Sequence, residues 1–548
     1  MDRKTLLAFV LIAVVLILTP WYMDIVSPRP QETVGLAEAP LTKLKRERTP
    51  NPSSTPNQPP PATENPSGPP AKEVVVENGL YTSTVSNKNG GSFASFILNQ
   101  YDRYDSTLVN LIDGINKNNL LVGFVSLDGE QISLNNNWSV IGNPRRLDAS
   151  TSQKNLLFQT TFNGYVVQKK LTFYPMSYSV DLEVTFKTPD RFVSRGEYTL
   201  SWNGGLTSSE KNTKDDHTYF KGYAYLGDEL LEPSAKENKL SEENQRGQTR
   251  WTAVKSKYFL SAIIPETPGL AASVSGLIED GRPVFNTTLV QPVSSGRATL
   301  YMGPQDYKAL RSLGVDLEKT MNLGWSIFRP LCRLITWSLT KMYAIIPNYG
   351  LVVIIFAFLV KLLLNPLTKQ SFISNKKMQA VQPEILKLKE RYKNDPKKLN
   401  SATMKLYKDR GVNPVGGCLP LLLQMPILIS FFTVFRSTIE FRGAPFFGWI
   451  TDLSAPDTLA TIGGFPLNIL PILMGGTMFL QQKLMATPGG GSQQKMMMYF
   501  MNVFFLFLFY SFPSGLNLYY SVFNILSIVQ QKYLTPDPVM AKSIQTPT

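Results

Sequence analysis

The apolar residues of this 548-residue chain are gathered into separate runs, and this distribution constrains the fold more than any other feature. One run extends from Leu6 to Leu18, and the others follow from Leu351 onward. The stretch between them is polar and contains short, strand-like alternations. Runs of this kind are typical of membrane-spanning helices. The chain is therefore predicted to be partly a soluble domain and partly a bundle of membrane helices.

The start of the chain is predicted to be a membrane anchor followed by an extended linker. Residues 1–26 combine a short charged start, the first apolar run and the interfacial pair Trp21-Tyr22. A cleaved signal peptide is the alternative, although the nearest small-x-small triplet, Ala37-Glu38-Ala39, lies far from the apolar run. Residues 27–72 are rich in Pro, Ser, Thr and Asn, which indicates a Pro-rich linker.

Residues 73–316 have the pattern of an antiparallel β-sandwich outside the membrane. Alternating runs such as Tyr165-Val166-Val167 are separated by turn signals. His217 lies in a polar stretch without a nucleophile signature, which favours a solvated loop histidine over a catalytic one. Cys332 and Cys418 are predicted to lie on opposite sides of the membrane. We therefore expect no disulfide between them. Two such cysteines and His217 also cannot form a Cys/His metal cluster, so no metal site is expected. No cofactor is expected either.

Residues 317–348 are predicted to hold an amphipathic interfacial helix along the outer membrane surface. A helix that packs on the β-domain is the alternative. The residues that define its two faces are Arg329, Arg333, Thr336 and Thr340 on one side, and Phe328, Leu331, Ile335 and Leu339 on the other.

Residues 349–535 are predicted to form a core of five membrane helices, followed by a cytoplasmic tail at 536–548. The first span contains one charge, Lys361, about one turn before its end, and the chain leaves the membrane at Asn365-Pro366. The later spans are expected at 418–435, 467–480, 496–510 and 516–529. Lys and Arg are concentrated between residues 365 and 417, so this loop is predicted to be cytoplasmic. Both termini are predicted to lie on the same side of the membrane as the loop. This rule also accounts for much of the net charge of +14, and a ribosome or anionic lipid contact stays open for the loop.

The basic loop is predicted to be a helical hairpin at 366–415. An apolar residue recurs every three or four positions, and Asp395-Pro396 is suited to begin the second helix. Two antiparallel helices would hide both apolar stripes, and the hairpin is either a stable element only or a docking site. The stripes are Met378, Val381, Ile385, Leu388 and Tyr392, then Leu399, Ala402 and Leu406.

Lys361 is the candidate functional charge of the core. Taken alone, it could reach the inner interface by snorkelling. The last span, however, carries a polar stripe that lipid tolerates poorly, made of Asn517, Ser521, Asn524 and Gln531 with Ser527 and Tyr520 nearby. Gln424 adds an amide at the cytoplasmic end of its span. These groups are predicted to line one wet, positively charged cavity, and a polar seam between helices is the alternative.

Several motifs resemble the YidC-type membrane protein insertases, and this resemblance covers nearly the whole chain. It is carried by Asn365-Pro366-Leu367-Thr368, by residues 412–420 and 424–426, and by residues 512–520. Gly90-Gly91 and Tyr301-Met302-Gly303-Pro304 resemble the periplasmic domain of Gram-negative members. The resemblance implies a five-helix core with a hydrophilic groove, and a hairpin that receives clients. Tyr519 is a groove candidate on the resemblance alone. The groove charge of the family is typically Arg, whereas Lys361 lacks the bidentate fork.

The sequence therefore predicts an insertase and chaperone of the bacterial inner membrane that performs no covalent chemistry and is not an enzyme. The expected partners are nascent membrane proteins, the Sec translocon, the ribosome and membrane lipid, with no role for DNA. A transporter or channel that uses the polar helix face is the alternative, and an anchored periplasmic binding protein is a third class. The predicted client-binding groove consists of Lys361, Gln424, Asn517, Tyr519, Tyr520 and Asn524.

Overall fold

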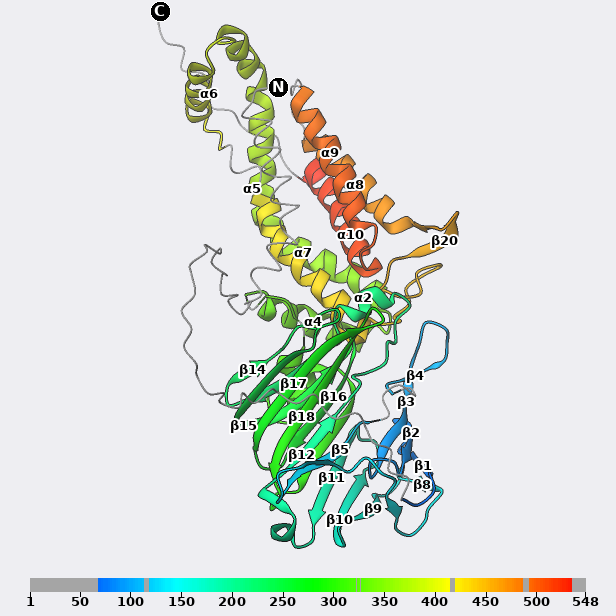
Figure 1. Cartoon of the computed structure of the whole chain (residues 1–548). Coiled ribbons are helices and arrows are strands. Elements are labelled where there is room, and N and C mark those ends of the chain that lie inside the picture. Colours follow the sequence, from blue (N-terminus) through cyan, green and yellow to red (C-terminus); the bar gives the residue numbers. More distant parts are fainter. Residues whose placement is uncertain are drawn as a thin grey trace, which may run out of the picture. The chain divides into compact units, whose positions relative to one another are not determined.

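The computed structural model describes residues 68–112, 118–321, 323–325, 327–413, 419–485 and 492–534. The predicted anchor, the linker up to residue 67, Cys418 and the predicted tail lie outside these residues. A β-domain comes first along the described chain and a set of helices follows it (Figure 1).

The smaller of the two sheets of the β-domain has five strands in the order β4-β3-β2-β1-β8. Its neighbours are antiparallel, except that β1 and β8 run parallel. The strands are β1 (Glu73–Glu77), β2 (Tyr81–Ser86), β3 (Ser92–Asp102), β4 (Leu108–Asn110) and β8 (Arg146–Asp148).

The larger sheet has 14 strands and is built from antiparallel pairs. Its main path is β6-β5-β12-β18-β17-β15-β16-β19-β11-β10-β9-β7, and β13 and β14 extend it beside β15. The strands are β5 (Leu121–Ser126), β6 (Gln131–Ser133), β7 (Ser139–Val140), β9 (Lys154–Phe162), β10 (Tyr165–Phe173), β11 (Ser179–Phe186), β12 (Val193–Trp202), β13 (Lys221–Leu226), β14 (Glu229–Leu231), β15 (Ser241–Lys255), β16 (Phe259–Pro265), β17 (Gly269–Glu279), β18 (Arg282–Pro292) and β19 (Arg297–Pro304).

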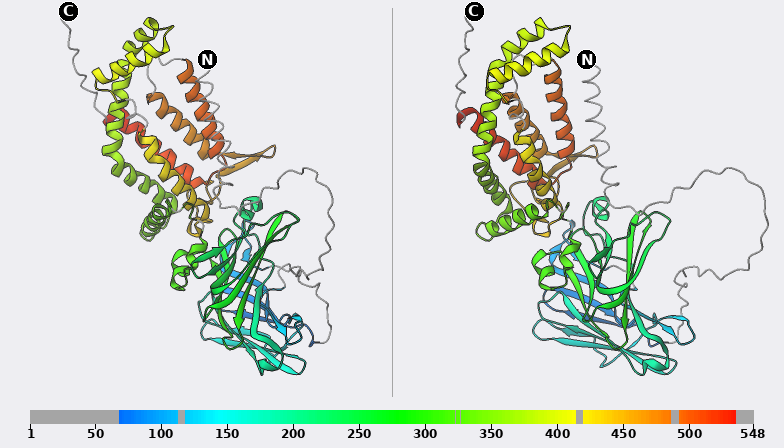
Figure 2. Two further views of the ribbon diagram at one scale, coloured as in Figure 1. Left: turned by 60° about the vertical axis from the view of Figure 1, so that its left-hand side comes forward. Right: turned by 90° about the vertical axis from the view of Figure 1, so that its left-hand side faces the viewer.

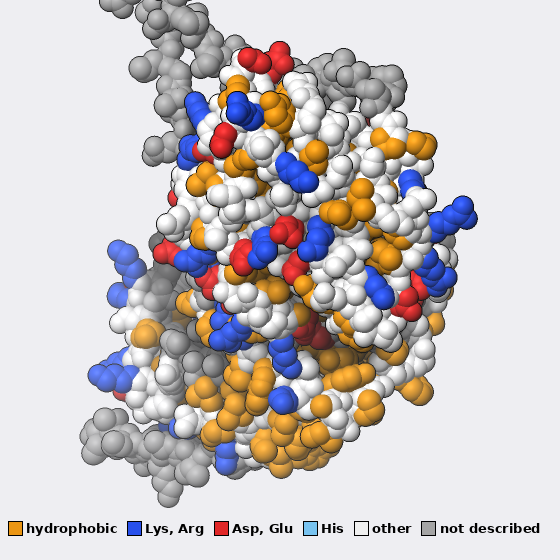
Figure 3. All heavy atoms as spheres, turned by 90° about the horizontal axis from the view of Figure 1, so that it is seen from below, with side chains coloured by type: hydrophobic (Ala, Val, Ile, Leu, Met, Phe, Trp, Pro, Cys, Tyr) orange, Lys and Arg blue, Asp and Glu red, His pale blue; other side chains and the backbone are white. Residues whose placement is uncertain are grey.

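The inward-facing side chains of both sheets form one buried core, so the predicted β-sandwich is confirmed. Val74 and Phe96 of the small sheet belong to the same cluster as Leu171 and Leu300 of the large one. Seen from the end of the β-domain, acidic and basic side chains are intermingled over the nearest face (Figure 3). Such mixed charge is typical of a solvated surface.

The turn at Gly90-Gly91 shows why two glycines stand there. Both residues have positive φ, 69° and 94°. A Cβ on Gly90 would lie 2.5 Å from the Trp138 ring, and one on Gly91 would lie 2.5 Å from the Phe158 ring. The backbone conformation and the two buried rings therefore both exclude a side chain here.

Two short helices, η1 (Pro189–Arg191) and α2 (Thr213–His217), lie between strands of the β-domain. The helices α3 (Tyr307–Ser312), η2 (Leu317–Thr320) and α4 (Arg329–Tyr343) lead from β19 to the helical part. The predicted amphipathic helix is thus present as α4, which buries Cys332, Ile335 and Leu339. It also exposes Leu334 and Trp337 by more than half. The predicted polar face is therefore partly apolar, which is the composition expected of a helix at a lipid surface.

The helical part contains the elements α5 (Tyr349–Arg391), α6 (Pro396–Asp409), α7 (Leu419–Ser437), η3 (Ile439–Phe441), α8 (Ile469–Met485), α9 (Ser492–Phe509), α10 (Ser514–Val529) and η4 (Gln530–Leu534). Each predicted core span corresponds to one of the helices α5, α7, α8, α9 and α10. Among the described residues, α5 has the length and hydropathy of a membrane span, and Met498–Phe509 is a shorter apolar helix. The total number of spans stays a prediction.

The predicted exit of the chain from the membrane at Asn365-Pro366 does not coincide with the end of helix α5. One helix of 43 residues continues through Pro366 and Pro383, and the level at which it leaves the membrane stays a prediction. At 1.5 Å per residue it is about 65 Å long, twice the thickness of a hydrocarbon layer. The Thr368 hydroxyl, two residues after Pro366, donates to the Leu364 carbonyl at 3.0 Å.

The predicted helical hairpin is confirmed. Its first helix is the last part of α5, and its second is α6, which begins at Pro396 with Asp395 accepting a hydrogen bond from the Lys398 backbone at 3.1 Å. The apolar stripes meet in a small core of Val381, Ile385 and Val412, with Met378, Leu406 and Tyr407 packed against it.

Replacing Gly515 with alanine should destabilise the helical core by about 1–3 kcal/mol, because a Cβ there would overpack it. That Cβ would lie 2.5 Å from the ring of the buried Phe435. Gly476→Ala is the matched control, since no atom lies within 4 Å of its Cβ position and alanine favours a helix. Thermal unfolding in detergent measures both variants. Equal melting temperatures would contradict the packing argument.

Candidate functional site

Lys361 lies where α5 meets α10. Its side chain is 7% exposed, and its Nζ donates to the Ser527 hydroxyl of α10 at 2.7 Å. The ammonium group also lies 4.7 Å from the centre of the Phe523 ring and 5.5 Å from that of Phe372. A cation over an aromatic face gains a modest electrostatic stabilisation. The amine therefore faces the last helix of the bundle, as predicted, and does not snorkel to the interface.

A polar network continues from Lys361 along the same two helices. The Gln530 side chain accepts from the Thr368 hydroxyl at 3.2 Å and donates to the Asn365 side chain. Lys361, Asn365 and Thr368 are four and three residues apart, so they share one face of α5. We call this set of five side chains (Lys361, Asn365, Thr368, Ser527 and Gln530) the Lys361 cluster.

Two of the predicted groove amides lie elsewhere along α10. Asn524 is 6% exposed and faces the Thr477 hydroxyl of α8 at 3.5 Å. Asn517 is fully buried and donates to the Phe509 and Phe512 carbonyls at 3.2 and 3.4 Å. Ten residues of helix, about 15 Å, separate Asn517 from Ser527. The structure therefore distributes the predicted site along the length of α10.

The two tyrosines of α10 belong to an aromatic layer. Tyr519 is fully buried and stacks on Phe431 of α7, with ring centres 4.1 Å apart. Tyr520 packs against the Phe509 ring at 5.8 Å. The half-buried side chain of Gln424, on α7, lies close to the Tyr520 hydroxyl. Gln424 is thus near Tyr520, while Lys361 contacts Ser527.

Several buried polar atoms of α10 and of η4, which follows it, have no protein partner within the described residues. They include the Oδ1 of Asn517, the hydroxyl of Tyr519 and the Oε1 of Gln531. Buried polar atoms in proteins are nearly always hydrogen-bonded, often through water. A helix carrying these atoms between lipid-facing neighbours is suited to contact water or the polar groups of another molecule.

Sequence reasoning missed Asn365, Thr368 and Gln530 as members of the site. The signal was available for the first two, because they follow Lys361 at helical spacing. It was obscured because Asn365-Pro366 was interpreted as the point where the chain leaves the membrane. Gln530 lies three residues after Ser527 and was passed over in favour of Gln531, which is also buried.

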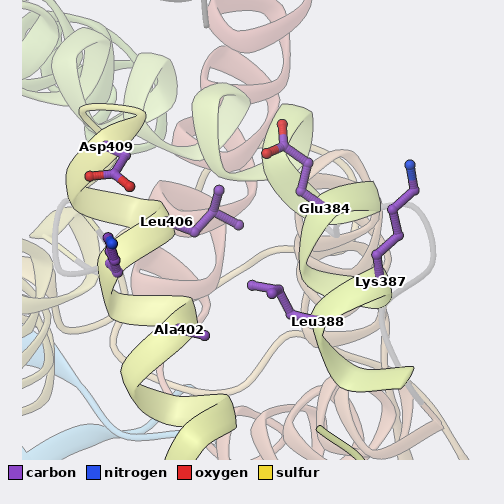
Figure 4. A pocket seen from close by; sticks show the side chains of 7 residues that line it. Glu384, Lys387, Leu388, Ala402, Leu406 and Asp409 are labelled. Atoms are coloured by element: carbon purple, nitrogen blue, oxygen red, sulfur yellow. The ribbon is translucent and has the colours of Figure 1, made fainter. Parts of the chain in front are cut away.

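A second concave feature lies on the hairpin between α5 and α6. Its volume is about 360 Å³. Leu388 and Leu406 point into the space between the helices, and Glu384, Lys387 and Asp409 stand around it (Figure 4). The Arg410 side chain pairs with Glu384 at 2.8 Å. An apolar floor with charges of both signs at its rim is suited to an amphipathic segment.

The sequence of the whole chain matches known families and relatives. Residues 341–540 match the 60Kd inner membrane protein family, and residues 73–337 match the YidC periplasmic domain. The membrane protein insertase YidC of Chlorobaculum parvum is 35% identical, covering 97% of this chain and 94% of the relative. That of Chlorobium phaeovibrioides is 37% identical over 85% of this chain and 83% of its own.

A solved structure titled as an active YidC insertase with its first transmembrane domain resolved is also similar. It has 19% sequence identity and a TM-score of 0.38, covering 84% of this chain and 92% of that chain. The family assignment rests on the sequence matches. With two family matches that together cover most of the chain and relatives matched almost end to end, this chain belongs to the YidC family of membrane protein insertases.

Proposed function

We propose that the polar face between α5 and α10 receives the hydrophilic part of a client while the client's apolar helix enters the lipid. Moving polar groups through hydrocarbon is costly because their hydrogen bonds to water are lost. The Lys361 cluster and the amides farther along α10 offer replacement partners. This lowers the barrier to insertion without any covalent step.

The observation that carries this proposal is the state of the Lys361 amine. It is buried, and within the part of the chain that the structure describes its contacts are a neutral hydroxyl and two aromatic rings. No Asp or Glu there pairs with it. A positive charge in this setting attracts an anionic group strongly, because the local dielectric is low. An acidic client tail supplies such a group.

The remaining assignments follow the charge of the loops and the resemblance. We propose that residues 1–26 anchor the chain, that 27–72 form a tether, and that the β-domain at 73–316 lies in the periplasm. Because the basic loop follows the positive-inside rule, we propose that it and both termini lie in the cytoplasm. The hairpin at 366–415 is proposed to meet the ribosome or the emerging client, and the core at 349–535 to act alone or with the Sec translocon.

Cysteines at positions 361 and 524 should crosslink to a stalled nascent membrane protein, because both positions face the polar side of α10. Single-cysteine variants without Cys332 and Cys418 are reconstituted in vesicles and photocrosslinked to ribosome-bound clients. Phe507→Cys is the control, since Phe507 is 82% exposed on α9. The proposal requires crosslinks at 361 and 524 to the polar tail of the client and at 507 only to its apolar helix. Absence of both polar-tail crosslinks would contradict it.

A measurement of ion flux distinguishes the proposed function from the transporter or channel alternative. Protein in vesicles that carries out insertion but passes no ions fits the proposed function. Steady conductance without a client would favour the channel.

A further inference from the structure

An uncharged β-hairpin stands between α7 and α8. Its strands are β20 (Thr458–Ile462) and β21 (Phe465–Asn468), and Ile462 is paired with Phe465 across the turn. Gly463 and Gly464 form that turn, both with positive φ, at 58° and 85°. Figure 1 and the left view of Figure 2 show the hairpin projecting sideways from the ends of the helices.

The surface of this hairpin is unusual for a strand pair in water. Every residue of β20 is exposed, and the exposed fractions of Leu459, Ile462 and Phe465 are 51%, 68% and 78%. No side chain from Thr458 to Asn468 is charged. Proteins normally protect exposed edge strands with charges, especially lysine, and here only Pro466 blunts an edge. An apolar hairpin without charges is expected in an apolar environment.

Hydrogen bonds fix the base of the hairpin at the ends of the membrane helices. Asn468, immediately before α8, donates to the Tyr510 carbonyl at 2.7 Å, and Tyr510 donates back to the Pro466 carbonyl at 2.5 Å. Asp457 accepts from the first two backbone amides of α8, those of Ile469 and Leu470, at 3.0 and 2.7 Å. The base of the hairpin therefore lies at the level where α8 begins and α9 ends.

Aromatic side chains mark the same level. Phe447 is 76% exposed and Trp449 is 37% exposed, and the Trp449 indole donates to Asp457 at 3.1 Å. Trp and other aromatic residues are enriched where a protein crosses the boundary between lipid and water. Just beyond the hairpin, Ile472 and Leu473 of α8 are about half exposed. Exposed apolar side chains thus continue along the sequence from the hairpin into α8.

We infer that the β20–β21 hairpin lies in the outer leaflet of the bilayer, with Leu459, Ile462 and Phe465 among the lipid chains near the headgroups. Five residues of strand reach about 16 Å, enough to extend along the boundary region. A lipid occupant fits better than a protein partner, because protein interfaces carry a polar rim, whereas the most exposed side chains of the hairpin are apolar and none is charged. In the membrane it acts as a lateral anchor that fixes the outer ends of α8 and α9.

Fluorescence quenching in vesicles tests this position. A variant with Ile462→Cys as its single cysteine, Cys332 and Cys418 having been replaced, is labelled with an environment-sensitive fluorophore. It is reconstituted in phosphatidylethanolamine and phosphatidylglycerol vesicles. Spin labels on the lipid chains, near the headgroup or deep, serve as quenchers. We expect a blue-shifted emission and about twofold quenching, stronger for the shallow label than for the deep one, as for a segment in the interface.

Two control positions calibrate the result. Asp190→Cys lies on an exposed residue of the β-domain and should show no quenching, whereas Phe507→Cys should be quenched by the deep label. A label at 462 that behaves like that at 190 would place the hairpin in water and overturn the inference. A blue shift without lipid quenching would also overturn it, because a protein surface would then cover the hairpin.

Discussion

Insertion of a client with an acidic tail should slow about thirtyfold when Lys361 is replaced with methionine, and more when it is replaced with glutamate. At an effective dielectric of ~20, two unit charges ~8 Å apart attract each other by about 2 kcal/mol. Methionine removes this attraction and keeps an unbranched side chain of similar length. Glutamate reverses it and leaves a buried carboxylate beside Ser527, whose hydroxyl is 2.7 Å from the lysine in the native chain.

Three comparisons make this result specific. Lys483→Met removes the same charge from an exposed position at the end of α8 and should leave insertion unchanged. Lys361→Arg keeps the charge and should stay within about threefold of the native rate. When Lys361 is replaced with methionine or glutamate, the insertion rate of a client with a neutral tail should fall far less than that of a client with an acidic tail. The measurement is protease protection of clients in reconstituted vesicles, normalised to folded insertase. Equal insertion of both clients by Lys361→Glu would refute the role of the charge.

The sequence predicted those features of the membrane part that depend on residues close together in the chain. The core helices follow from long apolar runs. Helices α7, α8, α9 and α10 begin and end within a few residues of the predicted limits, whereas α5 continues to Arg391. The meeting of Lys361 with α10 was also predicted, because a charge and a polar helix face in lipid must find each other. The helical hairpin of α5 and α6 was predicted from its apolar stripes and from the helix cap at Asp395.

The features that were missed depend on contacts far apart in the chain. Pro366 is a strong local signal for a helix end, yet α5 continues through it. Beside it, Thr368 and Gln530 donate to the Leu364 and Asn365 carbonyls. The separation of Asn517 and Asn524 into different contacts depends on where α8 and α9 pack. The β20–β21 hairpin was hidden in a loop that was notable only for its balanced charge.

Lys169 is the clearest example in the β-domain of a feature that could not be predicted from the sequence. Within the strand β10 it stands between Val167 and Leu171 on the inward face, but the adjacent Lys170 makes the pair look solvated. The structure places the Lys169 side chain fully inside the sandwich, where its Nζ donates to the Asn89 and Leu120 carbonyls at 2.9 and 2.6 Å. The Trp138 ring centre lies 5.5 Å away. The lysine therefore joins the Gly90-Gly91 turn to the large sheet.

This burial predicts a pH-dependent stability. Burial lowers the pKa of Lys169 from 10.5 to about 7, because the charged form loses its hydration. Between pH 7 and 10.5 the unfolded chain therefore binds more protons at this residue than the folded one, so the free energy of unfolding rises with pH across that window. Below pH 7 both states are charged, and the cost of burial is constant. From pH 7.5 to 9.0 the contribution of Lys169 is about 1.5–2 kcal/mol.

Replacing Lys169 with methionine should remove that contribution, so the rise in stability between pH 7.5 and 9.0 should shrink by about 1.5–2 kcal/mol. Other buried amines, such as Lys255 with its pKa lowered to about 8 by burial, act equally in both proteins and cancel in the difference. Lys170→Met is the matched control, because that neighbouring side chain is 41% exposed and pairs with Glu183. Hydrogen exchange of the β10 backbone amides in the whole protein measures the local free energy of opening at each pH. A Lys169→Met protein whose slope equals that of Lys170→Met would show that the buried amine does not titrate in this window.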